Sequence, residues 1–422
     1  MTKPNKGKET EDLVESVCKI MFLSDFTIRS PKYKKASGLQ KEAADFLVPF
    51  AQHLLAFQVK SKSEIKSWPE KDEKDFNRIN AIIEKGIGQL NTIKRALKAG
   101  HLLEMRNSRG INIPFDSKSR IKLIGIVIVD LIGEEHFRPE ERTGVFNGFT
   151  YHQEIPVHVF LRADFDLIAT EIDTLPDFIE FLDRRETLFS KQQLGPLTAE
   201  LDFLAIYKTR PALISDCLEG KCDLLIIEGG IWDRYIATHR KNIIERTYLN
   251  RPSYLVDSII TTIHSSIDYV PNIKYPSHKK AHALGTVENY WGVIVELSKL
   301  TRLQRRSVGE KLLEKMKKAD STGHGHALLM LDEKSALFIL SSDKDRQQRF
   351  NGLYNLSAIA YCGLGLKKIV GIATEPLSVK YRSYDGIVLD DVKFENHDEF
   401  AESFKTSFGA PEPFKITEYK ST

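Results

Sequence analysis

The sequence lacks the long apolar runs that membrane-spanning helices require. No stretch of about 18 apolar residues occurs among its 422 residues, so we expect no transmembrane segment and no membrane partner. The opening MTKPNKGKETED has no apolar core of the secretory kind, which favours a cytoplasmic protein. Gly-rich phosphate loops, helicase motifs and internal repeats are also missing, so any ATP-driven step would need a partner chain.

Cysteine is scarce as well. The four cysteines are too few and too scattered for a disulfide framework. Cys217 and Cys222 flank Leu-Glu-Gly-Lys, a poor spacing for zinc when no second pair of ligands lies nearby. We therefore expect ordinary thiols and a reduced environment.

Charge is nearly balanced overall but unevenly placed. The formal net charge is +3, yet residues 1–110 hold 21 Lys and Arg against 14 Asp and Glu, a net of +7. The remainder holds 40 against 44, a net of −4. A basic N-terminal region suits a phosphate-backbone partner, although scattered lysines on a solvated face would give the same count.

Hydrophobic periodicity predicts an α/β fold in the N-terminal part. The elements expected there are a helix over 9–22, a short strand within 24–33, strands over 43–50 and 53–62, a helix over 75–98, and strands over 120–131 and 157–161. This order is helix, three strands, helix, strand, strand, and it is typical of an α/β sandwich with a mixed sheet.

The rest of the chain divides into two further regions by its pattern. We expect a disordered tail over 1–8, a first domain over 9–190, a mostly helical region over 191–300 and a C-terminal α/β (α+β) domain over 301–422. The later elements expected are helices over 164–186, 199–207, 252–268, 287–303 and 347–362, and strands over 222–228, 328–331, 335–340, 368–373 and 384–389.

The stretch KEAADFLVPFAQHLLAFQVKSK, residues 41–62, carries the chemistry. Read as a hairpin, it sets Glu42 and Asp45 at the start of one strand beside Gln58 and Lys60 at the end of the next. Gln58 and Lys60 share a face of their strand because side chains alternate. Asp45, Gln58, the carbonyl of Val59 and additionally Glu42 offer oxygen ligands for a hard divalent cation, and Lys60 can orient a water and stabilise negative charge on phosphorus.

These residues resemble the PD-(D/E)xK restriction-endonuclease-like nucleases. The match lies in Asp45 followed by Gln58-Val59-Lys60, with a helix before the strands and another after them. Gln58 departs from the usual acidic residue, as in a known subgroup, and leaves the number of metal ions in doubt. Ala44 stands where the family has proline. The resemblance covers about residues 9–130, with residue 165 as its outer limit.

The resemblance implies a restriction-endonuclease-like sandwich that cuts DNA, less often RNA, with Mg²⁺ or Mn²⁺, in the setting of restriction or anti-phage defence. Some relatives place a glutamate on the first helix, for which Glu11 and Glu15 are candidates, or a glutamine on the second, where Gln89 fits. Each has an ordinary alternative: Glu15 on a solvated helix face and Gln89 as a buried structural amide. Asp45 and Lys60 could likewise form a structural ion pair, and Glu42 could be a surface charge.

Two rival functions stay open. The first is a catalytically silent nucleic-acid-binding or adaptor protein that keeps the nuclease fold. The second is a scaffold whose C-terminal domain binds a protein partner or a second copy of the chain, with the basic region incidental.

Overall fold

In the computed structural model the chain divides into two compact units, Met1–Ile243 and Ile244–Thr422. This division has one boundary where the sequence suggested boundaries near 190 and 300. The structure describes residues 6–22, 24–34, 38–62, 73–99, 102–107, 109–111, 113, 121–131, 148–194, 200–266, 287–408 and 412–413.

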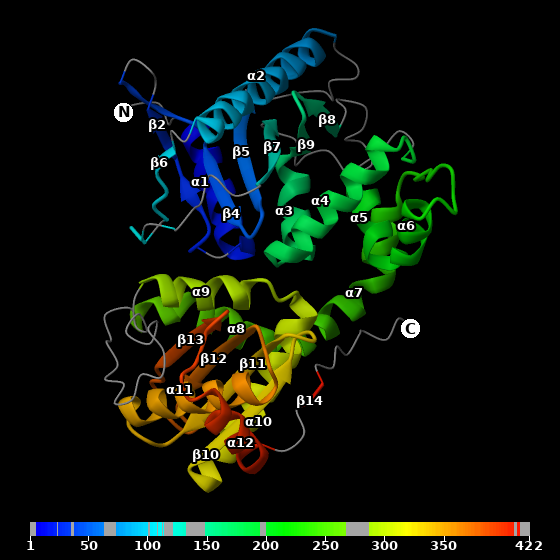
Figure 1. The fold of residues 1–422 in the computed structure, drawn as a ribbon. Helices are drawn as coiled ribbons and strands as arrows, with labels where there is room; N and C mark the ends of the chain where they lie inside the picture. Colours follow the sequence, from blue (N-terminus) through cyan, green and yellow to red (C-terminus); the bar gives the residue numbers. More distant parts are fainter. Residues whose placement is uncertain are drawn as a thin grey trace. The chain divides into compact units, whose positions relative to one another are not determined.

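A six-stranded mixed sheet organises unit 1, with strand order β1-β4-β5-β7-β9-β8 (Figure 1). Its central strands β5, β7 and β9 run parallel, whereas β1, β4 and β8 join the sheet antiparallel. The strands are β1 (Ile28–Arg29), β4 (Phe46–Phe50), β5 (His53–Lys62), β7 (Lys122–Leu131), β8 (Phe149–His152) and β9 (Ile155–Leu161). The near-continuous apolar runs of β7 and β9 are explained by burial on both faces of the sheet.

Helices cover the two faces of this sheet. On one face lie α1 (Lys6–Phe22) and α3 (Arg162–Glu171), and the rings of Phe57 in β5 and Phe165 in α3 meet edge to face. On the other lies α2 (Glu73–Lys98), where Leu90 packs so closely on Gly125 of β7 that an added Cβ would collide with it. The elements of this sheet and the helices on it follow the expected order of helix, three strands, helix and strand, but short strands of a second sheet intervene before β4 and before β7.

The remaining elements of unit 1 flank this core. A small sheet of order β3-β2-β6 stands beside it, and a group of helices follows α3. Thr174 caps α4, as its side chain accepts from the Asp177 backbone N–H and a proline follows it. These elements are β2 (Lys32–Lys34), β3 (Gln40–Glu42), β6 (Leu102–Glu104), α4 (Leu175–Ser190), α5 (Glu200–Thr209), α6 (Pro211–Leu218) and α7 (Ile231–Leu249).

Three expectations for unit 1 are wrong. Residues 6–8 belong to α1 rather than to a disordered tail, while residues 1–5 lie outside the described residues. Cys222–Glu228 is not a strand: in the described part of the chain its one bridge joins Leu225 to Leu194. Cys217 and Cys222 form a disulfide with their Cα atoms 4.6 Å apart, since the end of α6 turns back within the four residues between them.

Unit 2 is a second α/β assembly built on a sheet of order β13-β12-β11-β10-β14 (Figure 1). The expected hairpin is present as β10 and β11, and β11 runs parallel to β12. Its elements are α8 (Arg251–Thr262), a 3-10 turn (Ile263–Ser266), α9 (Val287–Ser298), α10 (Arg302–Thr322), β10 (His324–Met330), β11 (Ser335–Ser342), α11 (Arg346–Gly363), β12 (Lys368–Thr374), β13 (Tyr384–Asp390), α12 (His397–Ser407) and β14 (Glu412–Pro413).

The expected helix over 287–303 is in fact two helices. The first ends at Ser298, and Thr301 opens α10 with a capping box, exchanging hydrogen bonds with Gln304. Arg302 and Arg305 of α10 both pair with Asp257 of α8, at 2.6 and 2.7 Å. This buried ionic contact joins the two helices and gives α10 a partly charged buried face.

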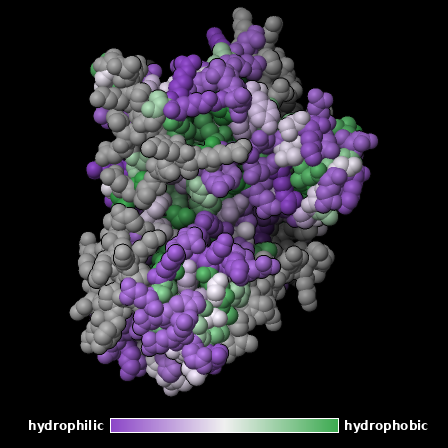
Figure 2. All heavy atoms as spheres, in the orientation of Figure 1, coloured by the Kyte–Doolittle hydropathy of each residue, from purple (hydrophilic) through white to green (hydrophobic). Residues whose placement is uncertain are grey.

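No helix in the described part of the chain is both long and apolar enough to cross a membrane. The view of Figure 2 shows a largely hydrophilic surface in which hydrophobic atoms appear as separate patches. Apolar side chains lie mainly inside each unit, as expected for two independent cores.

A buried ionic group fixes α4 and α5 to the sheet in unit 1. Arg185 is 0 % exposed, pairs with Glu200, and lies over the ring of Phe160. Its Nη1 donates to Nδ1 of His158 at 2.8 Å, so that ring nitrogen must be unprotonated. Burial, with Arg185 and Lys122, holds the pKa of His158 well below its usual range.

We therefore predict that unit 1 loses stability as the pH falls below about 6.5. The unfolded chain takes up a proton at His158 there and the folded chain does not, which costs up to about 1.4 kcal/mol per pH unit. Urea unfolding between pH 7 and pH 5 should show a smaller loss in His158→Asn, whose amide oxygen can still accept from Arg185. Equal losses in the two proteins would refute this origin.

Candidate active site

The hairpin of β4 and β5 builds the site from its register. The ladder begins with Phe46 opposite Phe57, and Asp45 comes directly before it. The Asp45 N–H donates to the Phe57 carbonyl at 3.2 Å, and the Val59 N–H donates to Oδ2 of Asp45 at 2.6 Å. The sequence-predicted juxtaposition of Asp45 with the end of the next strand is thus observed.

Three oxygen atoms converge on the ammonium group of Lys60. Its Nζ lies 3.4 Å from Oδ2 of Asp45, 3.1 Å from Oε1 of Gln58 and 3.0 Å from the carbonyl of Val59. The Gln58 side chain is 2 % exposed, and those of Asp45 and Lys60 are 17 % and 14 % exposed. The three atoms predicted as principal metal ligands therefore surround one point, where a cation is held.

Close packing of α2 holds the stem of Lys60. Gly86 of α2 faces the sheet, and a Cβ there would lie 3.0 Å from Val127 of β7 and 3.6 Å from Cγ of Lys60. The missing side chain lets the helix approach the lysine's methylene groups. The ammonium is thereby confined to the end of the strand, beside its three acceptors.

The first helix contributes Glu11 to the site. Burial and the neighbouring Asp45 carboxylate raise the pKa of Glu11, with Glu42 adding to the effect and Arg29 and Lys60 opposing it. These neighbours place the Glu11 carboxylate close to the charges of the hairpin. The Glu11 carboxylate also lies 3.8 Å from Nη2 of Arg29, which ties it to the edge of the sheet.

Glu15 shares Arg29 with Glu11. Its carboxylate binds Arg29 of β1 at 2.5 Å and Lys19 at 2.7 Å, so it ties α1 to the edge of the sheet. Arg29 also pairs with Asp12 at 2.6 Å. Glu15 is 7 % exposed, so the solvated helix face considered as its alternative is wrong.

A second contact fixes the start of α1. Thr10 donates to Oδ2 of Asp130, at the end of β7, at 2.5 Å. Arg162, at the start of α3, donates to the other oxygen of Asp130 at 2.9 Å. This contact lies one residue before Glu11, and it joins residues 120 positions apart, which no local motif indicates.

Glu42 and Gln89 are less closely involved. Glu42 is exposed on β3, opposite Lys32 of β2 in the register of the small sheet. Its charge helps to raise the pKa of Glu11, and among the described residues no hydrogen bond or ion pair joins it to Asp45. Gln89 is exposed on α2, contrary to the expected buried amide, and no hydrogen bond joins it to Asp45 or Lys60.

The donor set fits a hard divalent cation in its chemistry. A carboxylate, a side-chain amide oxygen and a backbone carbonyl are ligands that Mg²⁺ accepts, and Glu11 lies near as a second carboxylate. Within the described ranges, no three His, Cys, Asp or Glu side chains form a cluster able to hold a metal. The oxygens that converge on Lys60 do not form such a cluster, because two of the three belong to the Gln58 amide and the Val59 main-chain carbonyl.

Comparison with known proteins adds no relative, because no protein-family model, curated protein or solved structure matches the chain.

Neutralising Glu11 and Glu15 of α1 should have different effects on the free energy of unfolding. We predict that Glu15→Gln lowers the free energy of unfolding by about 1–2 kcal/mol, because Arg29 and Lys19 lose a charged partner. Glu11→Gln should leave it unchanged or raise it, since the raised pKa of Glu11 means that its ionised form is disfavoured in the fold. Urea unfolding at pH 7.5 measures both.

The exposed Glu9→Gln, in the first turn of the same helix, is the matched control. A stability loss in Glu11→Gln as large as that in Glu15→Gln would mean that both glutamates are structural.

Proposed function

We propose that unit 1 is a metal-dependent nuclease that hydrolyses phosphodiester bonds, with DNA as the favoured substrate. The observation that carries this proposal is the convergence of the Asp45, Gln58 and Val59 oxygens on Lys60 at the end of β5. The helix, three strands, helix, strand order around it supports a restriction-endonuclease-like core. A role in restriction or anti-phage defence follows from that resemblance alone.

Each residue has a distinct task in this proposal. Asp45 is held by the Val59 N–H, which donates to Oδ2, the oxygen that also faces Lys60. Its carboxylate would be the anionic ligand of the metal. Lys60 stabilises the negative charge that develops on the phosphorus oxygens and orients the attacking water. Bound Mg²⁺ would supply Lewis acidity and lower the pKa of that water. Glu11 would add the carboxylate that Gln58 lacks.

The substrate surface is expected to include the basic region around the site. Residues 1–110 carry a net charge of +7, and an anionic backbone would be drawn to them in a salt-dependent way. We propose that unit 2 serves as a recognition, regulatory or oligomerisation unit, with a protein partner or a second copy of the chain as its ligand.

The test is cleavage of plasmid DNA and of single-stranded RNA in the presence of about 5 mM Mg²⁺ or Mn²⁺, a concentration chosen to saturate the metal site. We predict that Asp45→Asn and Lys60→Met lower the cleavage rate at least about 100-fold, because each removes an interaction with the reacting phosphate. Glu11→Gln should lower it by about tenfold or more, having a less direct role.

Matched controls lie on α2, where Glu84→Gln and Lys85→Met change the same charges at exposed positions. Circular dichroism melts must show that each variant is folded. Cleavage that is equally fast in wild type and in both hairpin variants would place the activity elsewhere, or in a contaminant.

A catalytically silent nucleic-acid-binding protein is the second candidate. It is favoured by one observation: the Lys60 ammonium already satisfies the three oxygens, so the cluster is charge-balanced by the chain itself. If the protein is a nuclease, a titration with Mn²⁺, followed by the electron paramagnetic resonance signal of the free ion, should show metal binding. Asp45→Asn should weaken that binding. Salt-dependent DNA binding without any Asp45-dependent Mn²⁺ binding would favour the silent protein.

A further inference from the structure

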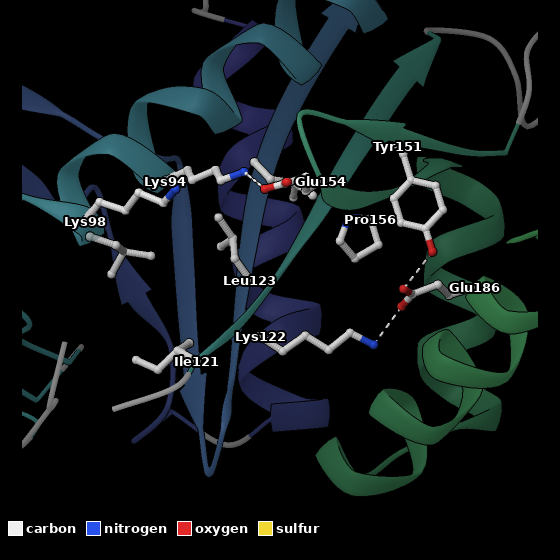
Figure 3. A pocket seen from close by; sticks show the side chains of 11 residues that line it. Lys94, Lys98, Ile121, Lys122, Leu123, Tyr151, Glu154, Pro156 and Glu186 are labelled. Carbon is white, nitrogen blue, oxygen red and sulfur yellow. Dashed lines mark hydrogen bonds and ion pairs between the residues drawn. The ribbon is translucent and has the colours of Figure 1, made fainter. Parts of the chain in front are cut away.

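A pocket of about 390 Å³ lies at the opposite end of the sheet from Asp45 and Lys60 (Figure 3). It is bordered by the last turns of α2, the start of β7 and the turn between β8 and β9. Lys122 opens β7, and Val129, the register partner of Lys60, comes seven residues later. At about 3.3 Å per residue the two sites are roughly 23 Å apart. The lining residues are Lys94, Leu97, Lys98, Ile121, Lys122, Leu123, Tyr151, Glu154, Ile155, Pro156 and Glu186.

The pocket combines apolar walls with a charged rim. Leu123, Pro156 and the half-exposed ring of Tyr151 supply flat or apolar surface, and Figure 3 shows the Tyr151 hydroxyl pointing to Glu186. That hydroxyl donates to Glu186 at 3.0 Å, and Lys122 lies 2.7 Å from the same carboxylate. Size and lining match those of small-ligand pockets, which span about 300–1,000 Å³ and hold a few fixed polar groups.

The three lysines differ in how they are engaged. Lys122 is held between Asp183 and Glu186, and Lys94 binds Glu154 at 3.0 Å. Within the part of the chain that the structure describes, Lys98 forms no hydrogen bond or ion pair. The last turn of α2 also carries Arg95, so both cations complement the helix dipole, but only Lys98 borders the pocket.

We propose that this pocket binds a small anion that carries a flat ring, of the size and chemistry of a nucleoside monophosphate. The ring packs on Tyr151 and Pro156, and its anionic group binds Lys98. Glu186, already fixed by Tyr151 and Lys122, accepts from an N–H of the base, on the ring or on an exocyclic amino group. The proposal is independent of the nuclease function, because it uses none of the residues around Asp45.

The experiment is isothermal titration of the full chain with each of AMP, GMP, CMP and UMP at 0.15 M salt, near the physiological ionic strength. At least one should bind, and Lys98→Ala should weaken it about tenfold or more, as expected for a lost charge-assisted hydrogen bond. Tyr151→Ala should weaken it similarly, whereas Tyr151→Phe should keep the ring contact and most of the affinity. Arg95→Ala, in the same helical turn, is the matched control and should bind as wild type does.

Titrations with further ligands show which part of the nucleoside monophosphate the pocket recognises. The matching nucleoside and inorganic phosphate should each bind at least tenfold more weakly than the monophosphate, and benzoate tests whether any ring with an anionic group suffices. Asp45→Asn should bind as wild type does, which separates this site from the hairpin. Absence of binding by all four monophosphates, or equal loss in Arg95→Ala and Lys98→Ala, would overturn the proposal.

Discussion

The ammonium group of Lys60 is the charge around which one end of the first sheet is arranged. It lies near the end of β5, where residues 54–57 and Val59 are apolar and buried, and a cation there needs oxygen acceptors to offset its lost hydration. Asp45, Gln58 and the Val59 carbonyl supply them from two adjoining strands. The register of the hairpin, the glycine on α2 and the approach of α1 all serve this one group.

Much of this arrangement could be predicted because it depends on short-range order. Alternation along two apolar strands fixes which side chains share a face, and antiparallel pairing then brings Asp45, just before β4, beside Phe57, Val59 and Lys60 of β5. The bounds of β5, 53–62, and of the long second helix follow from the same periodicities, within two residues.

What could not be predicted depends on contacts between distant segments. Glu11 and Glu15 are four residues apart on one side of α1, so helical periodicity cannot separate them. Both pair with Arg29 on β1, Glu15 at 2.5 Å and Glu11 at 3.8 Å, and burial and the charge of Asp45 raise the pKa of Glu11. The helix α10 was missed because Arg302 and Arg305 are buried by pairing with Asp257, which conceals its core face in a hydropathy pattern. The apolar run within 222–228 cannot show whether a neighbouring strand exists, and in the described part of the chain only Leu225 of this run forms a bridge.

Charge balance explains how Gln58 and Glu11 are connected. With glutamine at 58, the converging oxygens carry one negative charge, and Lys60 neutralises it; a carboxylate there would leave the cluster net negative. A divalent cation would add two positive charges, which one aspartate offsets poorly. Glu11 is the group that can respond, because its raised pKa reflects burial and the repulsion of Asp45 and Glu42. A cation among these oxygens would offset that repulsion and so lower the pKa of Glu11.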